Sequence, residues 1–420
     1  MKKAKNLLLI SVGVIILGMS ILYSCKNYTG PSNGQGLFAD KEKANNVDSG
    51  EDSTGTQMLT PDSQRVVVWA DSGIIPALTV MKDNILIAAV GSKTKGQLLI
   101  KESKDNGKNW TEVNAPSIGT DLNDSYVHPF FINCHNGDIL LGVATTNASQ
   151  NSLYLYRSRD GKTWNQQVSN ITMDKNPTTE GNKKLTSKNA IVTYGNGITL
   201  RHKNNAGKNK LLFPYYYNTS SRDSITGLYK SSVATMISTN DGKSWEKYGK
   251  DQGEYTSHIS KFIELNDGNV LYFMNDASRR VAWFESTNCG ETSKCTTLFT
   301  KGAHNEDRIQ YADFARYEFD GRDIKGAEYA LMVFSTDKAS YSVKMTTDDF
   351  NKGKDNKSGT YLGGGSKVIA ANLTKPSAIY PTITVLKDGT IATLAAEDDG
   401  MVFRRFELNW FLEDELWMEQ

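Results

Sequence analysis

The sequence predicts an all-β fold, a six-bladed β-propeller over residues 63–420. Six apolar segments each contain a short polar turn, often with Asp-Gly, Asn-Gly or Asp-Asn, and this pattern is typical of a β-hairpin. The hairpins begin 53 to 69 residues apart, which suits four short strands with loops, and no sustained helical periodicity interrupts them. Four strands are the unit of a propeller blade. The six segments are residues 76–90, 129–145, 197–217, 261–275, 314–335 and 383–397.

Residues 1–25 have the pattern of an export signal. A basic leader precedes an apolar run of sixteen residues, and Tyr-Ser-Cys follows, ending at Cys25. This end resembles the bacterial lipoprotein box, in which the signal is removed and the cysteine is acylated. The resemblance implies lipidation at Cys25 and an extracytoplasmic, membrane-anchored protein. An uncleaved membrane anchor is the alternative.

Residues 26–62 are rich in Gly, Ser, Asn and Asp and contain few apolar side chains. Such a segment cannot bury enough surface to offset the entropy lost on ordering. We therefore expect a flexible tether between the signal and the propeller.

Charge and cysteine usage restrict the classes of partner. The formal net charge is +1, so the composition gives no indication of a nucleic-acid partner. In an oxidising compartment Cys289 and Cys295 could form a disulfide, with Cys134 alone and buried. Neither the cysteines nor the five histidines fall at metal-ligand spacing, so we expect no metal and no cofactor.

A short turn motif, Ser-x-Asp-x-Gly-x-x-Trp, recurs with variations. The Ser and Asp side chains can bond the local backbone, Gly takes the strained turn position, and Trp packs into the sheet. The motif resembles the Asp-box, or BNR, repeat, which favours a propeller but says little about activity, because it lies far from the catalytic mouth and also occurs in non-enzymes. The matching residues are Ser103, Asp105, Gly107 and Trp110; Ser158, Asp160 and Trp164; and Ser238, Asn240, Gly242 and Trp245, with a partial match at Ser286.

Three longer segments, taken in order, resemble the sialidase family. They are "SGIIPALTV" (72–80), "HISKFIELNDGNVLYFMNDASRRVAWFES" (258–286) and "SAIYPTITVLKDGTIATLAAEDDGMVFRRFELNWF" (377–411). In that family an arginine triad grips the carboxylate of sialic acid. A Tyr paired with a Glu attacks the anomeric carbon, and an Asp handles the leaving-group proton.

Only two of the family's site residues match. The nucleophile falls on Tyr380, and the Glu one strand later, which orients the first arginine in the family, falls on Glu397. The three arginine positions fall on Ile74, on Asn275 and at or near Tyr341.

The acidic positions are not matched either. Residues 84–101 contain no Asp or Glu where the acid is expected, and the partner Glu of the nucleophile falls near Ile259, with Glu254 the nearest carboxylate upstream. Three absent arginines would remove on the order of 5 kcal/mol of binding to a substrate carboxylate. Cations that could substitute are Lys93, Lys95, Arg279, Arg280, Arg308 and Arg316.

The sequence therefore leads to one main hypothesis and two alternatives. The main hypothesis is a membrane-tethered, sialidase-like protein that binds glycans or glycoconjugates and whose exo-α-sialidase activity is weakened or lost. The first alternative is an active glycoside hydrolase with Tyr380 as nucleophile and Glu254 or Glu306 as its partner. The second is a structural or protein-binding propeller. The aromatic run at residues 213–218 is either a sugar-stacking face or a strand that alternates between core and surface.

Overall fold

A computed structural model places most of residues 58–412. The described ranges are 58–70, 73–92, 96–117, 126–146, 152–168, 190–192, 194–201, 209–222, 229–255, 260–265, 268–275, 281–286, 293–294, 309–319, 330–336, 339–346, 366–374 and 379–412. The expected signal and nearly all of the expected tether lie outside these ranges, as do Cys289 and Cys295.

The described strands form six sheets. The first sheet contains β2 (Gly73–Val80), β3 (Leu86–Ser92), β4 (Leu98–Ser103) and β5 (Thr111–Val113), and the second contains β6 (Tyr126–Asn133), β7 (Ile139–Thr146), β8 (Ser152–Ser158), β9 (Asn165–Val168) and the short β11 (Gly195–Asn196). The third contains β10 (Ala190–Val192), β12 (Ile198–Thr199), β13 (Leu211–Arg222), β14 (Tyr229–Ser238) and β15 (Glu246–Tyr255), and the fourth contains β16 (Ser260–Glu264), β17 (Val270–Asn275), β18 (Val281–Ser286) and β19 (Ser293–Lys294). The fifth contains β20 (Ile309–Arg316), β21 (Ala330–Thr336), β22 (Tyr341–Thr346) and β23 (Ser366–Ala370), and the last contains β24 (Thr382–Val385), β25 (Ile391–Glu397), β26 (Gly400–Phe406) and β1 (Arg65–Trp69).

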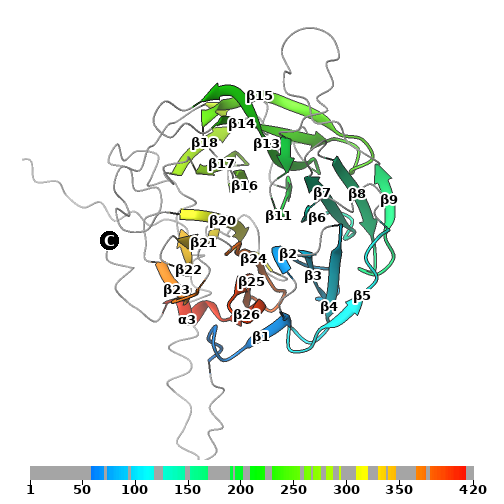
Figure 1. The fold of residues 1–420 in the computed structure, drawn as a ribbon. Coiled ribbons are helices and arrows are strands. Elements are labelled where there is room, and N and C mark those ends of the chain that lie inside the picture. The colour runs from blue at the N-terminus through cyan, green and yellow to red at the C-terminus, as the bar shows by residue number, and fades with distance from the viewer. Residues whose placement is uncertain are drawn as a thin grey trace, which may run out of the picture. The chain divides into compact units, whose positions relative to one another are not determined.

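The sheets follow one another around a closed ring. The inner strand of each sheet contacts the next sheet: β2 contacts β6, β12 contacts both β6 and β16, β16 contacts β20, and β20 contacts β24. Contacts between β24 and β2 close the ring, and Figure 1 shows the sheets in chain order around it. The prediction of an all-β propeller is confirmed. The last sheet is completed by β1, which pairs with β26 although the two strands are more than 300 residues apart in sequence.

The turns of the predicted hairpins form where turn residues stand in the sequence. Asn84, Gly137, Gly268 and Gly389 all have positive φ, between 58° and 89°, which Asn and Gly tolerate best. Each donates its backbone N–H to the carbonyl three residues earlier, at 2.8–3.0 Å. These four hairpins are therefore determined by local chemistry.

The third sheet differs from the simple hairpin that the sequence predicts. Its inner strand is interrupted: β10 and β12 both pair with β13, whereas β11 between them leaves the sheet and pairs in parallel with β6 of the second sheet. Gly195 makes this departure possible, because it has φ +85°. The segment therefore lies among the inner strands, where β11 also contacts β2, β20 and β24.

The Ser-x-Asp-x-Gly-x-x-Trp turns are held by their own side chains. In the first, the Ser103 hydroxyl donates to Asp105 at 2.8 Å and accepts from the N–H of Gly107 at 2.9 Å, and the Trp110 indole donates to the Gly107 carbonyl at 3.0 Å. Ser238, Asn240, Gly242 and Trp245 repeat these three bonds at 3.0, 2.8 and 3.1 Å. The shorter turn after Ser158 keeps the Ser-to-Asp160 bond at 3.0 Å. These turns follow the third strand of their sheets, at the end of the ring where the inner strands finish.

Replacing Gly107 by Ala is expected to destabilise the propeller more than the same change at Gly137. Both glycines have φ near +87°, a conformation that costs an L-residue about 1–2 kcal/mol. A Cβ at Gly107 would also overlap the ring of Phe403 in the last sheet, whereas at Gly137 it would meet only the flexible Lys82 chain at 3.2 Å. We expect Gly107→Ala to cost a further 1 to 3 kcal/mol, roughly, from overpacking. Urea denaturation of both variants measures the difference, and equal losses would contradict this account.

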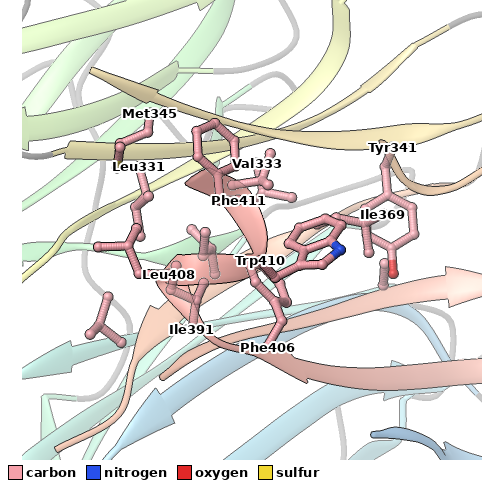
Figure 2. Close-up of a cluster of buried hydrophobic side chains, with 14 of the residues drawn as sticks. Leu331, Val333, Tyr341, Met345, Ile369, Ile391, Phe406, Leu408, Trp410 and Phe411 are labelled. Atoms are coloured by element: carbon pink, nitrogen blue, oxygen red, sulfur yellow. The ribbon is translucent and has the colours of Figure 1, made fainter. Parts of the chain in front are cut away.

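A short helix, α3 (Leu408–Leu412), covers the junction of the last two sheets and was not predicted. Figure 2 shows Trp410 and Phe411 pointing into the buried cluster between these sheets. The Trp410 ring lies 4.9 Å from that of Phe406, centroid to centroid. Over the residues that the structure places, no helix is long and apolar enough to cross a membrane.

Cys134 is a free, buried cysteine, as the sequence predicts. Burial raises the pKa of its thiol to about 12, so the thiol stays protonated at physiological pH.

Candidate functional site: a tyrosine cluster at the start of the inner strands

Three tyrosines from different sheets meet at the end of the ring where the inner strands begin, which we call the mouth. Tyr380 precedes β24, Tyr311 lies near the start of β20, and Tyr194 immediately precedes β11. They pack with Ile75 of β2. The ring centroids of Tyr380 and Tyr311 are 3.9 Å apart, and the Tyr194 ring lies 5.4 Å from that of Tyr380 at a nearly perpendicular angle. We call these three side chains the tyrosine cluster.

The Tyr380 phenol is held in its neutral form. Burial raises its pKa well above the usual value near 10, and the neighbouring phenols of Tyr311, with which it shares a hydrogen bond, and of Tyr216 raise it further. No carboxylate of the described side chains is among the groups that act on Tyr380. Glu306 and the side chain of Glu254, the partners considered from sequence, lie outside the described residues.

A buried ion pair supports the cluster from below. Lys261 Nζ of β16 lies 3.0 Å from Asp313 Oδ1 of β20, and both side chains are no more than 2% exposed. The same ammonium group donates to the backbone carbonyl of Tyr194 and lies 4.7 Å from the centre of its ring. Thr382 donates to Asp313 Oδ2 at 2.6 Å. Sequence reasoning missed this pair, although a lysine within the apolar strand "KFIEL" is a signal that could have pointed to it.

Tyr194 connects the fifth sheet to the segment before the last sheet through its hydroxyl group. Its hydroxyl lies 3.3 Å from the carbonyl of Ala312 in β20 and 3.4 Å from the carbonyl of Pro381, immediately before β24. A Cβ at Gly195 would overlap Lys261 Nζ and lie 2.8 Å from Asp313 Oδ2. Only glycine therefore lets this segment pass so close to the ion pair.

Glu397 lies in a different set of contacts. Arg404 binds its carboxylate with two hydrogen bonds of 2.7 and 2.9 Å, Arg65 of β1 approaches to 3.0 Å, and the Tyr341 hydroxyl donates to it at 2.8 Å. None of these partners belongs to the tyrosine cluster. Tyr341, which stands near the third arginine position, is fully buried and faces Glu397.

The remaining sequence candidates fall in three places. Arg316 lies at the end of β20, away from the mouth, where it pairs with Glu318 at 3.0 Å. Ile74 and Asn275 lie in β2 and β17, but their side chains are not among those described. Lys93, Lys95, Ile259, Arg279, Arg280 and Arg308 are outside the described residues. Over the described residues no group of His, Cys, Asp and Glu is arranged to hold a metal ion.

Comparisons with known proteins point to sialidases. No family model matches the chain. A sialidase from Micromonospora viridifaciens is 25% identical over 374 residues, which cover 80% of this chain and 51% of that protein. Among solved structures, the Hadza microbial sialidase Hz136 has a TM-score of 0.58 and 16% identity, over 81% of this chain and 66% of the other. The Trypanosoma rangeli sialidase in complex with sialic acid has a TM-score of 0.58 and 15% identity, over 83% and 56%.

The matched region spans about half the length of the bacterial relative, and between half and two thirds of the solved chains. Because the sequence identities to the solved structures are low, the structural likeness shows only that the fold is shared. This chain thus has the propeller fold found in sialidases and a distant sequence relative among them.

Proposed function

We propose that this chain is a sialidase-like propeller that binds glycans at its mouth and whose exo-α-sialidase activity is weakened or lost. The observation that carries the proposal is the setting of Tyr380, whose described neighbours are phenols and Ile75. The cation beneath them, Lys261, is neutralised by Asp313. Phenol rings with hydroxyl groups suit the apolar faces and hydroxyls of sugars.

The same setting argues against ordinary sialidase turnover. A tyrosine nucleophile needs a nearby base to take its proton, because burial among other phenols makes ionisation harder. Of the two family residues that match the sequence, Glu397 binds Arg404, Arg65 and Tyr341, none of which belongs to the tyrosine cluster around the other, Tyr380. The second candidate function is an active glycosidase that uses Tyr380, and it is favoured by the sialidase relatives and by the central position of this residue.

Location and repeats belong to the same proposal. We infer that Cys25 is lipidated, that residues 26–62 tether the propeller to the outside of a membrane, and that the turns after Ser103, Ser158 and Ser238 are Asp-boxes. Incorporation of a labelled fatty acid into the wild-type protein but not into a Cys25→Ala variant tests the lipid anchor.

Substituting Tyr380 separates the two candidate functions. A binder is expected to keep glycan binding in Tyr380→Phe, which retains the ring, and to lose about tenfold in affinity in Tyr380→Ala, which removes a stacking surface. A glycan array with wild-type protein identifies the ligand, and calorimetry with that ligand compares the variants. The wild-type protein should release little fluorophore from a fluorogenic sialoside. Turnover at an ordinary sialidase rate that Tyr380→Phe abolishes would establish the enzyme instead.

A further inference from the structure

A hollow lies on the axis of the ring, at the end opposite the tyrosine cluster. It has a volume of about 220 Å³, and the inner strands of all six sheets contribute to its lining. We call it the axial cavity. Its polar lining residues are Thr79, Asn133, Asn196, Thr199, Arg201, Glu264, Arg316, Glu318 and Thr384.

The axial cavity is separate from the mouth. The lining residues come from the final positions of β2, β6, β16, β20 and β24, whereas Ile75, Tyr311 and Tyr380 come from the starts of these strands or just before them. Between the two levels lie Gly195 and the Lys261–Asp313 pair. A ligand in the axial cavity would therefore contact none of the tyrosine cluster.

The charges around the axial cavity balance and are held in place. The Glu318 carboxylate forms ion pairs with the guanidinium groups of Arg201, at 2.9 Å, and of Arg316, at 3.0 Å. Glu264 accepts the backbone N–H of Arg201 with both oxygens, at 2.9 and 3.1 Å. Two guanidinium groups thus stand against two carboxylates. A site with balanced, paired charges gives no net attraction to an anion, but it offers donors and acceptors in fixed positions.

One polar atom of the lining is unsatisfied within the described part of the chain. Asn196 Oδ1 is buried and has no hydrogen-bond partner, while Nδ2 of the same amide makes only a long contact of 3.5 Å to the Ile383 carbonyl. Buried polar atoms are nearly always paired, so an orphaned acceptor beside a cavity requires a donor from a water or a ligand.

From these observations we propose that the axial cavity is a second ligand site, and that its ligand is a neutral polyhydroxylated molecule of monosaccharide size. Hydroxyl groups can donate to Asn196 and to the carboxylates and accept from the guanidinium groups, which an anion or a cation alone cannot do. The volume of the cavity suits a ligand of monosaccharide size, because the cavity is smaller than sites for drug-sized ligands, which are roughly 300 to 1,000 Å³. The side chain of Arg201 lines the cavity and is 49% exposed. The cavity therefore reaches the protein surface, where such a molecule can enter.

The test uses the propeller in its full chain with three neutral probes, methyl β-galactoside, N-acetylglucosamine and myo-inositol, and with N-acetylneuraminic acid as an anionic probe. Saturation-transfer NMR and titration should show saturable, weak binding of at least one neutral probe, with a Kd in roughly the millimolar range for so small a ligand. N-acetylneuraminic acid should not displace it.

Two variants locate the site. Asn196→Leu removes the orphaned acceptor and should weaken binding by about fivefold or more. Ile198→Phe should block the cavity by filling it from β12 without removing a polar group. Thermal melting confirms that each variant is folded, and Tyr380→Ala should leave this binding unchanged.

The outcomes are distinguishable. Binding that both cavity variants weaken and Tyr380→Ala does not supports the second site, whether or not the mouth binds glycans. The proposal is overturned if no neutral probe binds the folded wild-type protein, or if a folded Ile198→Phe variant binds as well as the wild type. It is also overturned if N-acetylneuraminic acid displaces the neutral probe.

Discussion

Asp313→Asn is expected to lower the free energy of unfolding by about 3 to 5 kcal/mol, because breaking a buried ion pair leaves its other member uncompensated. Lys261 and Asp313 are no more than 2% exposed, so water cannot replace the lost partner. Urea denaturation at pH 7 measures the loss.

The same variant should become more stable as the pH rises. Burial lowers the pKa of Lys261, and Asp313 opposes this shift, so removing the carboxylate lowers the pKa further. Between that lowered value and the ordinary value near 10.5, the unfolded chain binds a proton that the folded chain does not. The free energy of unfolding therefore rises with pH through this window. Burial raises the pKa of Tyr194 well above 10, so its ionisation in the unfolded chain lowers the free energy of unfolding as the pH approaches 10. The rise due to Lys261 is therefore measured below about pH 9.

The matched control removes both charges. Lys261→Met combined with Asp313→Leu should recover much of the stability lost in Asp313→Asn, since apolar residues of similar volume often replace a buried pair without loss. If Asp313→Asn is as stable as the wild type and shows no added dependence on pH, the Lys261–Asp313 pair does not stabilise the centre of the propeller.

Arg404→Met is expected to lower the free energy of unfolding by about 3 kcal/mol and to loosen β1. The Glu397 carboxylate is only 3% exposed, and it would lose the guanidinium group that binds it with two hydrogen bonds. Arg404 also bonds Asp62 and the Pro61 carbonyl, just before β1. Because β1 is the outer strand of the last sheet, its release would leave the outer edge of β26 unpaired, near the point where the two ends of the described chain meet. Urea denaturation and limited proteolysis within residues 58–69 measure the two effects.

Arg65→Met is the matched control for this prediction. Arg65 also binds Glu397, but its side chain is 31% exposed, so its loss should cost about 1 kcal/mol or less. Equal losses for the two variants, or protease resistance of β1 in Arg404→Met, would mean that the backbone pairing with β26 holds β1 in place without help from the ion pairs.

The architecture could be predicted because its signals are local. A hairpin turn depends on the backbone of a few adjacent residues, so Asn84, Gly137, Gly268 and Gly389 could be identified from their neighbours alone. The same holds for the Ser103 turn, whose bonds all join residues within six positions of one another. The six-part spacing of these signals indicated the propeller.

The composition of the site depended on contacts between distant segments. Tyr380 was identified from its family motif, but Tyr194 and Tyr311 were not, because nothing near them in sequence marks them as neighbours of Tyr380. Glu397 matched a motif, yet the structure surrounds it with Arg404, Arg65 and Tyr341.

From sequence alone, then, this protein was determined to be an all-β propeller with a tyrosine at the start of its last sheet. Tertiary structure alone decided that Gly195 passes beside the Lys261–Asp313 pair, separating a tyrosine-lined mouth from a charge-balanced cavity. The physical reason is range: turns depend on φ and on hydrogen bonds within a few residues, whereas burial and ion pairing depend on which strands the closed ring brings together.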